Sequence, residues 1–293
     1  MNRILQSKLA GLGAAALVAA SGTAHAGVSS TLTIATDYDF RGITQNALDP
    51  AFQGSLDWEG ESGLYAGLWG SNIDFGQDGG EGVDPVDLNV EVDFILGYAG
   101  SFTEDLGYDL GATYYKYLGD DNGDVDFDYL ELYTGLSYKI VSGTVWYSSD
   151  FSNSGETAWY AELNAEVPVV WDVNVVLHGG YNFGDYWKPE AFGLDEFYDY
   201  SVGLARSFGR FDFEVKYIDG SDLKELDCSR SGVECLDDVF SSESKVYFAI
   251  STTLPWTDAG GSQRLDNAVN PAQPARPRGV SYCSAFASCI SSA

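Results

Sequence analysis

The sequence predicts an all-β protein: a transmembrane, antiparallel, up-and-down β-barrel of twelve strands with long acidic external loops and short periplasmic turns. Three observations support this fold. Apolar residues alternate with small or polar ones in twelve segments between Gly27 and Trp256. An export signal precedes these segments, and the connections between them are short and long in turn. Strands of this kind have one apolar and one polar face, as in barrels whose outer wall contacts lipid.

The first 26 residues have the pattern of a secretory signal peptide. Arg3 and Lys8 give a positive start, residues 9–20 are small and apolar, and Ala24–Ala26 fits a small-x-small cleavage site. The apolar run is shorter than the roughly 20 residues of a spanning helix, which makes a membrane anchor the weaker alternative. We therefore expect a signal peptide at 1–26, a barrel at 27–256 and an extension at 257–293.

The chain is strongly acidic, with 44 Asp and Glu against 15 Lys and Arg and a formal net charge of −29. This composition excludes nucleic acid as a partner, since binding it requires Lys and Arg to neutralise phosphates. Two interpretations of the acidity stay open. It gives solubility and solvated loops, or it lines a lumen that favours cations and neutral solutes over anions.

Each expected strand follows from the alternation of its residues. In the clearest one, Glu91 and Asp93 share one face, opposite a face of large apolar residues. Glu162 and Glu166 do the same in another strand. A soluble core would bury such carboxylates without partners, whereas a hydrated lumen would not. The expected strands span residues 31–41, 51–60, 63–73, 88–101, 106–118, 127–140, 143–150, 157–167, 171–183, 197–208, 210–219 and 244–255.

The first strand carries a notable group of charges. If alternation continues through 31–41, Tyr38 and Phe40 face lipid, and Asp37, Asp39 and Arg41 face the lumen. These three charges would form either an ion-paired belt near the outer mouth or a structural network that holds the first loop against the wall.

The connections sort by length into two classes. Tight turns are expected at 61–62, 103–105, 141–142, 168–170 and 209, and long connections at 42–50, 74–87, 119–126, 151–156, 184–196 and 220–243. An even number of strands places all the tight turns at one rim and the long loops at the other. Within the long loops, Asp120–Asp124 resembles part of a calcium loop. It lacks the ligand spacing of an EF-hand, so a solvated loop without metal is expected.

Four cysteines lie in the last part of the chain. Export favours a disulfide between Cys228 and Cys235, inside the longest loop. Cys283 and Cys289 fall in residues 257–293, which are rich in Ala, Ser, Pro and Arg and are expected to be disordered. That extension is either a frameshift or read-through product, or a periplasmic tail that contacts peptidoglycan or a partner.

The candidate site is the polar inner face of the barrel, and no catalytic, cofactor or metal site is expected. His178 would face the lumen, but no Gly-x-Ser-x-Gly elbow accompanies it, so a structural role is favoured over a hydrolase. Four basic residues are expected to point inward and pair with carboxylates: Arg41, Lys139, Lys216 and Lys245. The candidate pore-lining residues are Asp37, Asp39, Arg41, Asp57, Glu91, Asp93, Glu131, Glu162, Glu166, His178, Asp212, Glu214 and Lys216.

Several stretches resemble the TorF porin family. They are residues 37–45 (DYDFRGITQ), 49–54 (DPAFQG), 63–72 (GLYAGLWGSN), 91–93 (EVD), 97–98 (GY) and 131–133 (ELY), in that order. Together they cover most of residues 30–256, and the residues after Trp256 lie outside the resemblance. The resemblance implies an outer-membrane porin barrel and leaves the solute undefined.

We therefore expect a porin-like channel in the outer membrane of a Gram-negative bacterium, passing small solutes passively through an acidic lumen that prefers cations or neutral molecules. Its partners would be outer-membrane lipid, lipopolysaccharide and small polar solutes, either as a monomer or as a homo-oligomer. The alternatives are a non-conducting structural or adhesive barrel and, with less support, a barrel-embedded lipid hydrolase. A soluble β-sandwich is the alternative fold.

Overall fold

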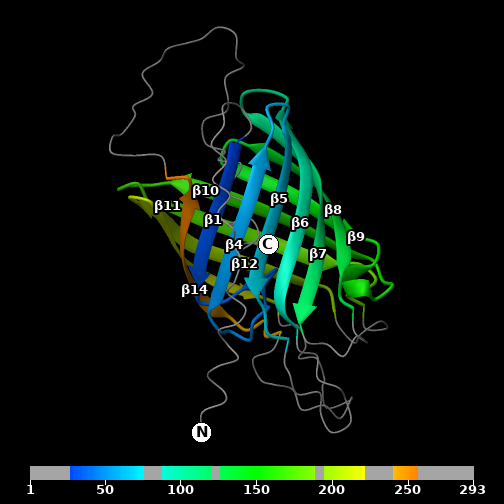
Figure 1. Cartoon of the computed structure of the whole chain (residues 1–293). Coiled ribbons are helices and arrows are strands. Elements are labelled where there is room, and N and C mark those ends of the chain that lie inside the picture. The colour runs from blue at the N-terminus through cyan, green and yellow to red at the C-terminus, as the bar shows by residue number, and fades with distance from the viewer. Residues whose placement is uncertain (1–26, 76–87, 120–125, 189–194, 222–239, 257–293) are drawn as a thin grey trace.

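The computed structural model is a closed antiparallel barrel of twelve strands (Figure 1). It describes residues 27–75, 88–119, 126–188, 195–221 and 240–256. Each strand pairs with its neighbours in the sequence, and pairing of the first strand with the last closes the sheet. The predicted fold class is confirmed in its strand number and its antiparallel, closed topology.

The twelve wall strands match the twelve alternating segments of the sequence. They are β1 (Gly27–Ala35), β4 (Ala51–Glu59), β5 (Leu64–Asn72), β6 (Leu88–Ser101), β7 (Leu106–Gly119), β8 (Tyr129–Tyr138), β9 (Val141–Ser148), β10 (Ala158–Pro168), β11 (Asn174–Phe183), β12 (Phe197–Phe208), β13 (Phe211–Gly220) and β14 (Lys245–Leu254). A two-stranded hairpin, β2 (Asp39–Phe40) with β3 (Ile43–Thr44), and a short 3-10 helix at Phe151–Asn153 complete the described elements.

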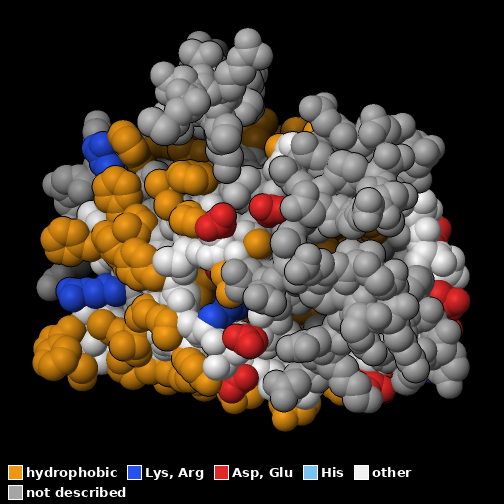
Figure 2. Space-filling model, turned by 90° about the horizontal axis from the view of Figure 1, so that it is seen from below, with side chains coloured by type: hydrophobic (Ala, Val, Ile, Leu, Met, Phe, Trp, Pro, Cys, Tyr) orange, Lys and Arg blue, Asp and Glu red, His pale blue; other side chains and the backbone are white. Residues whose placement is uncertain are grey.

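The outer wall is apolar and the interior is mixed. Outward positions carry exposed large side chains such as Ile34, Phe52, Leu96 and Leu204, while the inward neighbours of these residues are buried. The end view shows hydrophobic side chains gathered along the left side of the perimeter, and acidic side chains both near the middle and at the right edge (Figure 2). Within the described residues, no helix is long and apolar enough to cross a membrane.

The described connections lie at the two rims as their lengths predict. The tight turns lie at the upper end in Figure 1, and the long connections that are fully described, 42–50 and 151–156, lie at the lower end. Two turns differ from the prediction. The turn predicted at 168–170 spans residues 169–173, and the turn predicted at 141–142 lies at Lys139 and Ile140, so that β9 already begins at Val141. Lys139 adopts a positive φ of 55° there. Its side chain is 56% exposed beside Asp105, so the prediction that Lys139 points into the lumen is wrong.

Two further positions differ in the face they present. The pairing of β6 with β7 shifts register between Leu88 and Val90, so Leu88 is buried inside the barrel although the alternation predicts it on the apolar outer face. From Val90 onward the predicted faces hold, with Glu91 and Asp93 inside. The second difference is the end of the first strand, which leaves the wall at Ala35.

Candidate functional site

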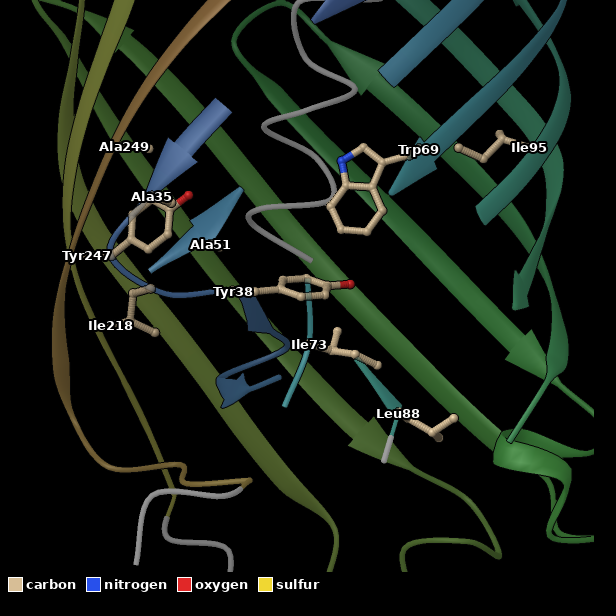
Figure 3. Close-up of a cluster of buried hydrophobic side chains, with 10 residues drawn as sticks. All are labelled: Ala35, Tyr38, Ala51, Trp69, Ile73, Leu88, Ile95, Ile218, Tyr247 and Ala249. Carbon is tan, nitrogen blue, oxygen red and sulfur yellow. The ribbon is translucent and has the colours of Figure 1, made fainter. Parts of the chain in front are cut away.

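The residues that follow β1 form a hairpin inside the barrel. Residues 36–46, called the inner hairpin below, are predicted as the last part of a wall strand followed by the start of a loop. Instead the chain turns inward, and β2 and β3 pair with each other only. Tyr38 is 0% exposed and packs against Trp69 of β5, with ring centroids 5.2 Å apart (Figure 3). The prediction that Tyr38 faces lipid is therefore wrong.

Local hydrogen bonds explain why the inner hairpin turns at these residues. The Asn46 side chain accepts a bond from the Tyr38 amide at 2.8 Å, and the Thr44 hydroxyl donates to Asp37 at 2.5 Å. Gly42 has a φ of +83°, which favours glycine. A Cβ on Gly42 would also lie 2.8 Å from the Cβ of Asp199 in β12. Only glycine therefore fits both the turn and the opposite wall.

Arg41 ties the tip of the inner hairpin to the far side of the barrel. Its guanidinium donates two hydrogen bonds to the Glu131 carboxylate of β8, at 3.0 and 2.7 Å. In the barrel order β8 is five strands from β1 by one route and seven by the other, so this ion pair spans the lumen. The guanidinium also lies 4.4 Å from the ring centroid of Tyr160 and 4.6 Å from that of Phe40.

The environment of Arg41 keeps it charged. The side chains of Arg41 and Glu131 are 2% and 0% exposed. Burial by itself lowers the pKa of Arg41, but the adjacent Glu131 charge and its hydrogen bond raise the pKa by more, so the net shift is upward. A buried pair with bidentate geometry is costly to break, because removal of one partner leaves the other charge uncompensated.

A second ion pair holds the base of the inner hairpin. Lys245 of β14 lies 2.5 Å from an Asp37 oxygen and 2.7 Å from an Asp39 oxygen. Asp37, Asp39 and Arg41 thus bind the hairpin to both sides of the wall. Of the two arrangements that the sequence left open, the geometry is that of a structural network, and it crosses the lumen instead of lining one side of it.

Tyr38 connects the inner hairpin to the acidic wall of β6. Its hydroxyl donates to Glu91 at 2.8 Å. Burial, followed by the charges of Glu91 and Asp93, raises the pKa of the Tyr38 hydroxyl, so it stays a donor. Within the described residues, eight Asp and Glu side chains are buried and only two Lys and Arg side chains are. The interior therefore keeps an acidic excess after its ion pairs are formed.

His178 of β11 belongs to a network on the barrel wall that includes Tyr160, the residue against which the Arg41 guanidinium lies. Its Nε2 lies 2.7 Å from Asp199 and 3.0 Å from the Tyr160 hydroxyl, and its Nδ1 lies 2.7 Å from the Asn164 amide oxygen. A Glu162 oxygen is 3.9 Å from Nδ1. Both ring nitrogens are thus engaged by Asp199, Tyr160 and Asn164, and no Ser, Thr or Cys side chain is among these partners.

The other predicted lumen residues lie at different depths. Asp57 is buried and accepts from Ser55 at 2.6 Å. Lys216 is buried and lies 3.4 Å from the less buried Glu214. Glu166 and Asp212 are exposed, bonded to Asn174 and Ser207 respectively. Cys228, Cys235, Cys283 and Cys289, the Asp120–Asp124 loop, residues 1–26 and the extension 257–293 lie outside the described residues.

The sequence reasoning missed Asp199, which belongs to the His178 network and lies beside Gly42 of the inner hairpin. The signal was present in the alternation of 197–208, because Asp199 shares a face with Ser201 and Gly203 opposite Tyr198, Tyr200 and Val202. Across the part of the chain that the structure describes, no three His, Cys, Asp or Glu side chains gather in a way that could hold a metal ion.

Comparisons with known proteins place the chain in a sequence family. A family model described as a bacterial protein of unknown function (Gcw_chp) matches residues 19–253. No curated protein matches the chain.

Solved structures with a similar course of the chain include a KdgM porin, with 8% identity, a TM-score of 0.44, and coverage of 78% of this chain and 99% of the other. A NanC porin has 10% identity, a TM-score of 0.44 and coverage of 78% and 100%. LpxR from Salmonella typhimurium has 10% identity, a TM-score of 0.38 and coverage of 77% and 99%. The fold assignment rests on the strand pairing of this chain itself.

Proposed function

The chain belongs to the Gcw_chp family of bacterial proteins of unknown function, and from the geometry of its interior we propose that it is an outer-membrane channel for passive diffusion of small solutes. The observation that carries this proposal is the inversion of the barrel, apolar outside and acidic within, with a charged hairpin across the lumen. The resemblance of residues 37–54 to the TorF porin family supports the same function and stays a prediction.

The width and the charge of the lumen suggest what would pass. A barrel of twelve strands is wider than the eight-stranded kind that side chains fill, and narrower than porins of about 16 to 18 strands. The inner hairpin narrows it further at the end of the barrel where β1 ends and β4 begins. Small cations and small neutral molecules would therefore be favoured, because an acidic constriction repels anions.

Neutralising the wall of β6 tests this selectivity. The double variant Glu91→Gln, Asp93→Asn is expected to lower the ratio of cation to anion permeability by at least about twofold, because two negative charges leave the constriction. Reversal potentials in planar bilayers under a KCl gradient measure the ratio. Asp105→Asn is the matched control, since that carboxyl is 56% exposed in a tight turn. Anion selectivity of the unaltered protein would refute the proposal.

A conductance measurement also separates the channel from the alternatives. A correctly folded, reconstituted protein that does not conduct would favour a structural or adhesive barrel. Membrane placement is checked by recovery in the outer-membrane fraction and by heat-modifiable mobility on a gel. A soluble protein would show neither property.

The hydrolase alternative is tested at His178. Both ring nitrogens of His178 are held by Asp199, Tyr160 and Asn164. His178→Gln is therefore expected to leave the conductance within about twofold of the unaltered value, because it removes no acidic side chain from the constriction. The same variant is assayed for hydrolysis of phospholipid and lipopolysaccharide acyl chains. An acyl hydrolase activity that disappears with His178 would overturn the channel assignment.

A further inference from the structure

Glu91 and Asp93 stand out among the interior carboxylates because they lie two residues apart on one strand face and neither forms an ion pair within the described residues. Glu131 forms an ion pair with Arg41, and Asp37 and Asp39 both form ion pairs with Lys245. Across the described residues, no Lys, Arg or His nitrogen lies within ion-pair distance of Glu91 or Asp93. Two adjacent buried carboxylates are unfavourable as anions, so this part of the wall favours the uptake of either a cation or a proton.

The hydrogen bonding of this region is also incomplete. Asp93 is 0% exposed, and neither of its carboxylate oxygens has a hydrogen-bond partner. Gln53 of β4 is 5% exposed, and neither atom of its amide group has one. Buried polar groups are nearly always satisfied. The Asp93 carboxylate and the Gln53 amide lie on the same inner wall without hydrogen-bond partners, and this indicates that a polar ligand binds between them.

The strand register brings these groups to one place. Gln53 pairs with Ser71 on β5, and Ser71 pairs with Glu91 on β6, so the three residues lie on one line across three strands. All three point inward, and the small Ser71 lies between the two longer side chains. Asp93 follows two residues after Glu91 on the same face. Tyr38 covers the group from the inner hairpin through its bond to Glu91.

We propose that Glu91, Asp93 and Gln53 form a binding site for one divalent cation of the calcium or magnesium class. Two carboxylates balance two positive charges, and carboxylate and amide oxygens are the ligands that these hard cations prefer. No third acidic ligand is gathered within the described residues. The ion therefore keeps several waters, as magnesium ordinarily does with one or two carboxylates.

The experiment compares the thermal stability of the purified, processed protein in detergent under three conditions of equal ionic strength: NaCl with a chelator, CaCl2 and MgCl2. The unaltered protein is expected to lose its heat-modifiable form about 5 °C or more higher in at least one divalent salt, because a ligand that binds only the folded state stabilises it. The arm that gives the larger shift identifies the preferred ion.

Asp93→Asn is the decisive variant, and Asp57→Asn, another buried inward carboxyl, is its matched control. In chelator, Asp93→Asn is expected to be at least as stable as the unaltered protein, since an unbalanced charge is gone. In the divalent salt it is expected to lose the shift, whereas Asp57→Asn keeps it. Ions bound by the acidic loops would shift all three proteins alike.

Two results would overturn the site: no divalent-specific shift in the unaltered protein, or an equal shift in Asp93→Asn. The inference rests on the proposed function only in that the lumen must admit an ion. Because the test of the cation site measures thermal stability and not current, the cation site and the channel function can be refuted independently of each other. A barrel that binds the ion without conducting refutes the channel alone, and one that conducts without a divalent-specific shift refutes the site alone.

Discussion

Replacing Arg41 by Gln is expected to detach the inner hairpin from β8 and to raise single-channel conductance severalfold. The reason is geometric: the Arg41–Glu131 pair is the contact that holds the hairpin tip across the lumen, at 2.7 and 3.0 Å. The same change leaves Glu131 buried without its cation, which costs about 3–5 kcal/mol of unfolding free energy. Urea-induced unfolding of the protein reconstituted in lipid vesicles measures the free energy of unfolding, and planar-bilayer recording measures the single-channel conductance.

The control and the rescue for this variant follow from the same contacts. Lys139→Gln removes a basic residue from an exposed pair with Asp105 at 3.8 Å, so it is expected to change stability by less than about 1 kcal/mol. Arg41→Met combined with Glu131→Met removes both buried charges and should recover much of the lost stability, while conductance stays high. Unaltered conductance in Arg41→Gln would show that the inner hairpin is not the constriction.

The wall of the barrel was predictable because it depends on local sequence. Each strand needs only its own alternation of apolar and polar residues, and an even number of strands joined by turns of alternating length closes without further information. Glu91 and Asp93 on β6, and Glu162 on β10, lie inside as that alternation predicts. The predicted face failed at Leu88 because a register shift, which local alternation does not encode, changes its direction.

The inner hairpin was not predictable by the same reasoning because its partners are distant in the sequence. Alternation continues past Ala35, so Tyr38 takes an outward position in any reading of the strand alone. The position of Tyr38 is fixed by its hydrogen bond to Glu91. The position of Arg41 is fixed by its ion pair with Glu131, which lies 90 residues further along the chain. Gly42 and the neighbouring acidic residues indicated a turn, but nothing local said that the turn lies inside the barrel.

The two adjacent glycines of β11 give the sharpest test of how the interior is packed. Gly180 faces inward, and a Cβ there would overlap the ring and hydroxyl of Tyr160. Gly179 faces outward, and a Cβ there would meet no atom within 4 Å. Gly180→Ala is therefore expected to destabilise the barrel by about 1–3 kcal/mol through overpacking, whereas Gly179→Ala should be neutral or slightly stabilising. Urea unfolding of both variants measures the difference.

The consequence of Gly180→Ala should extend beyond stability, because Tyr160 occupies a shared position. Its ring lies 4.4 Å from the Arg41 guanidinium, and its hydroxyl contacts both His178 and Asp199. A displaced Tyr160 would loosen the tip of the inner hairpin, so conductance should rise in the same direction as in Arg41→Gln. Tyr160→Phe keeps the ring but removes the hydroxyl. Combined with Gly180→Ala in a double variant, it is expected to relieve part of the overlap between the new Cβ and the Tyr160 side chain. If Gly180→Ala and Gly179→Ala unfolded alike, the packing of Tyr160 over β11 would be refuted.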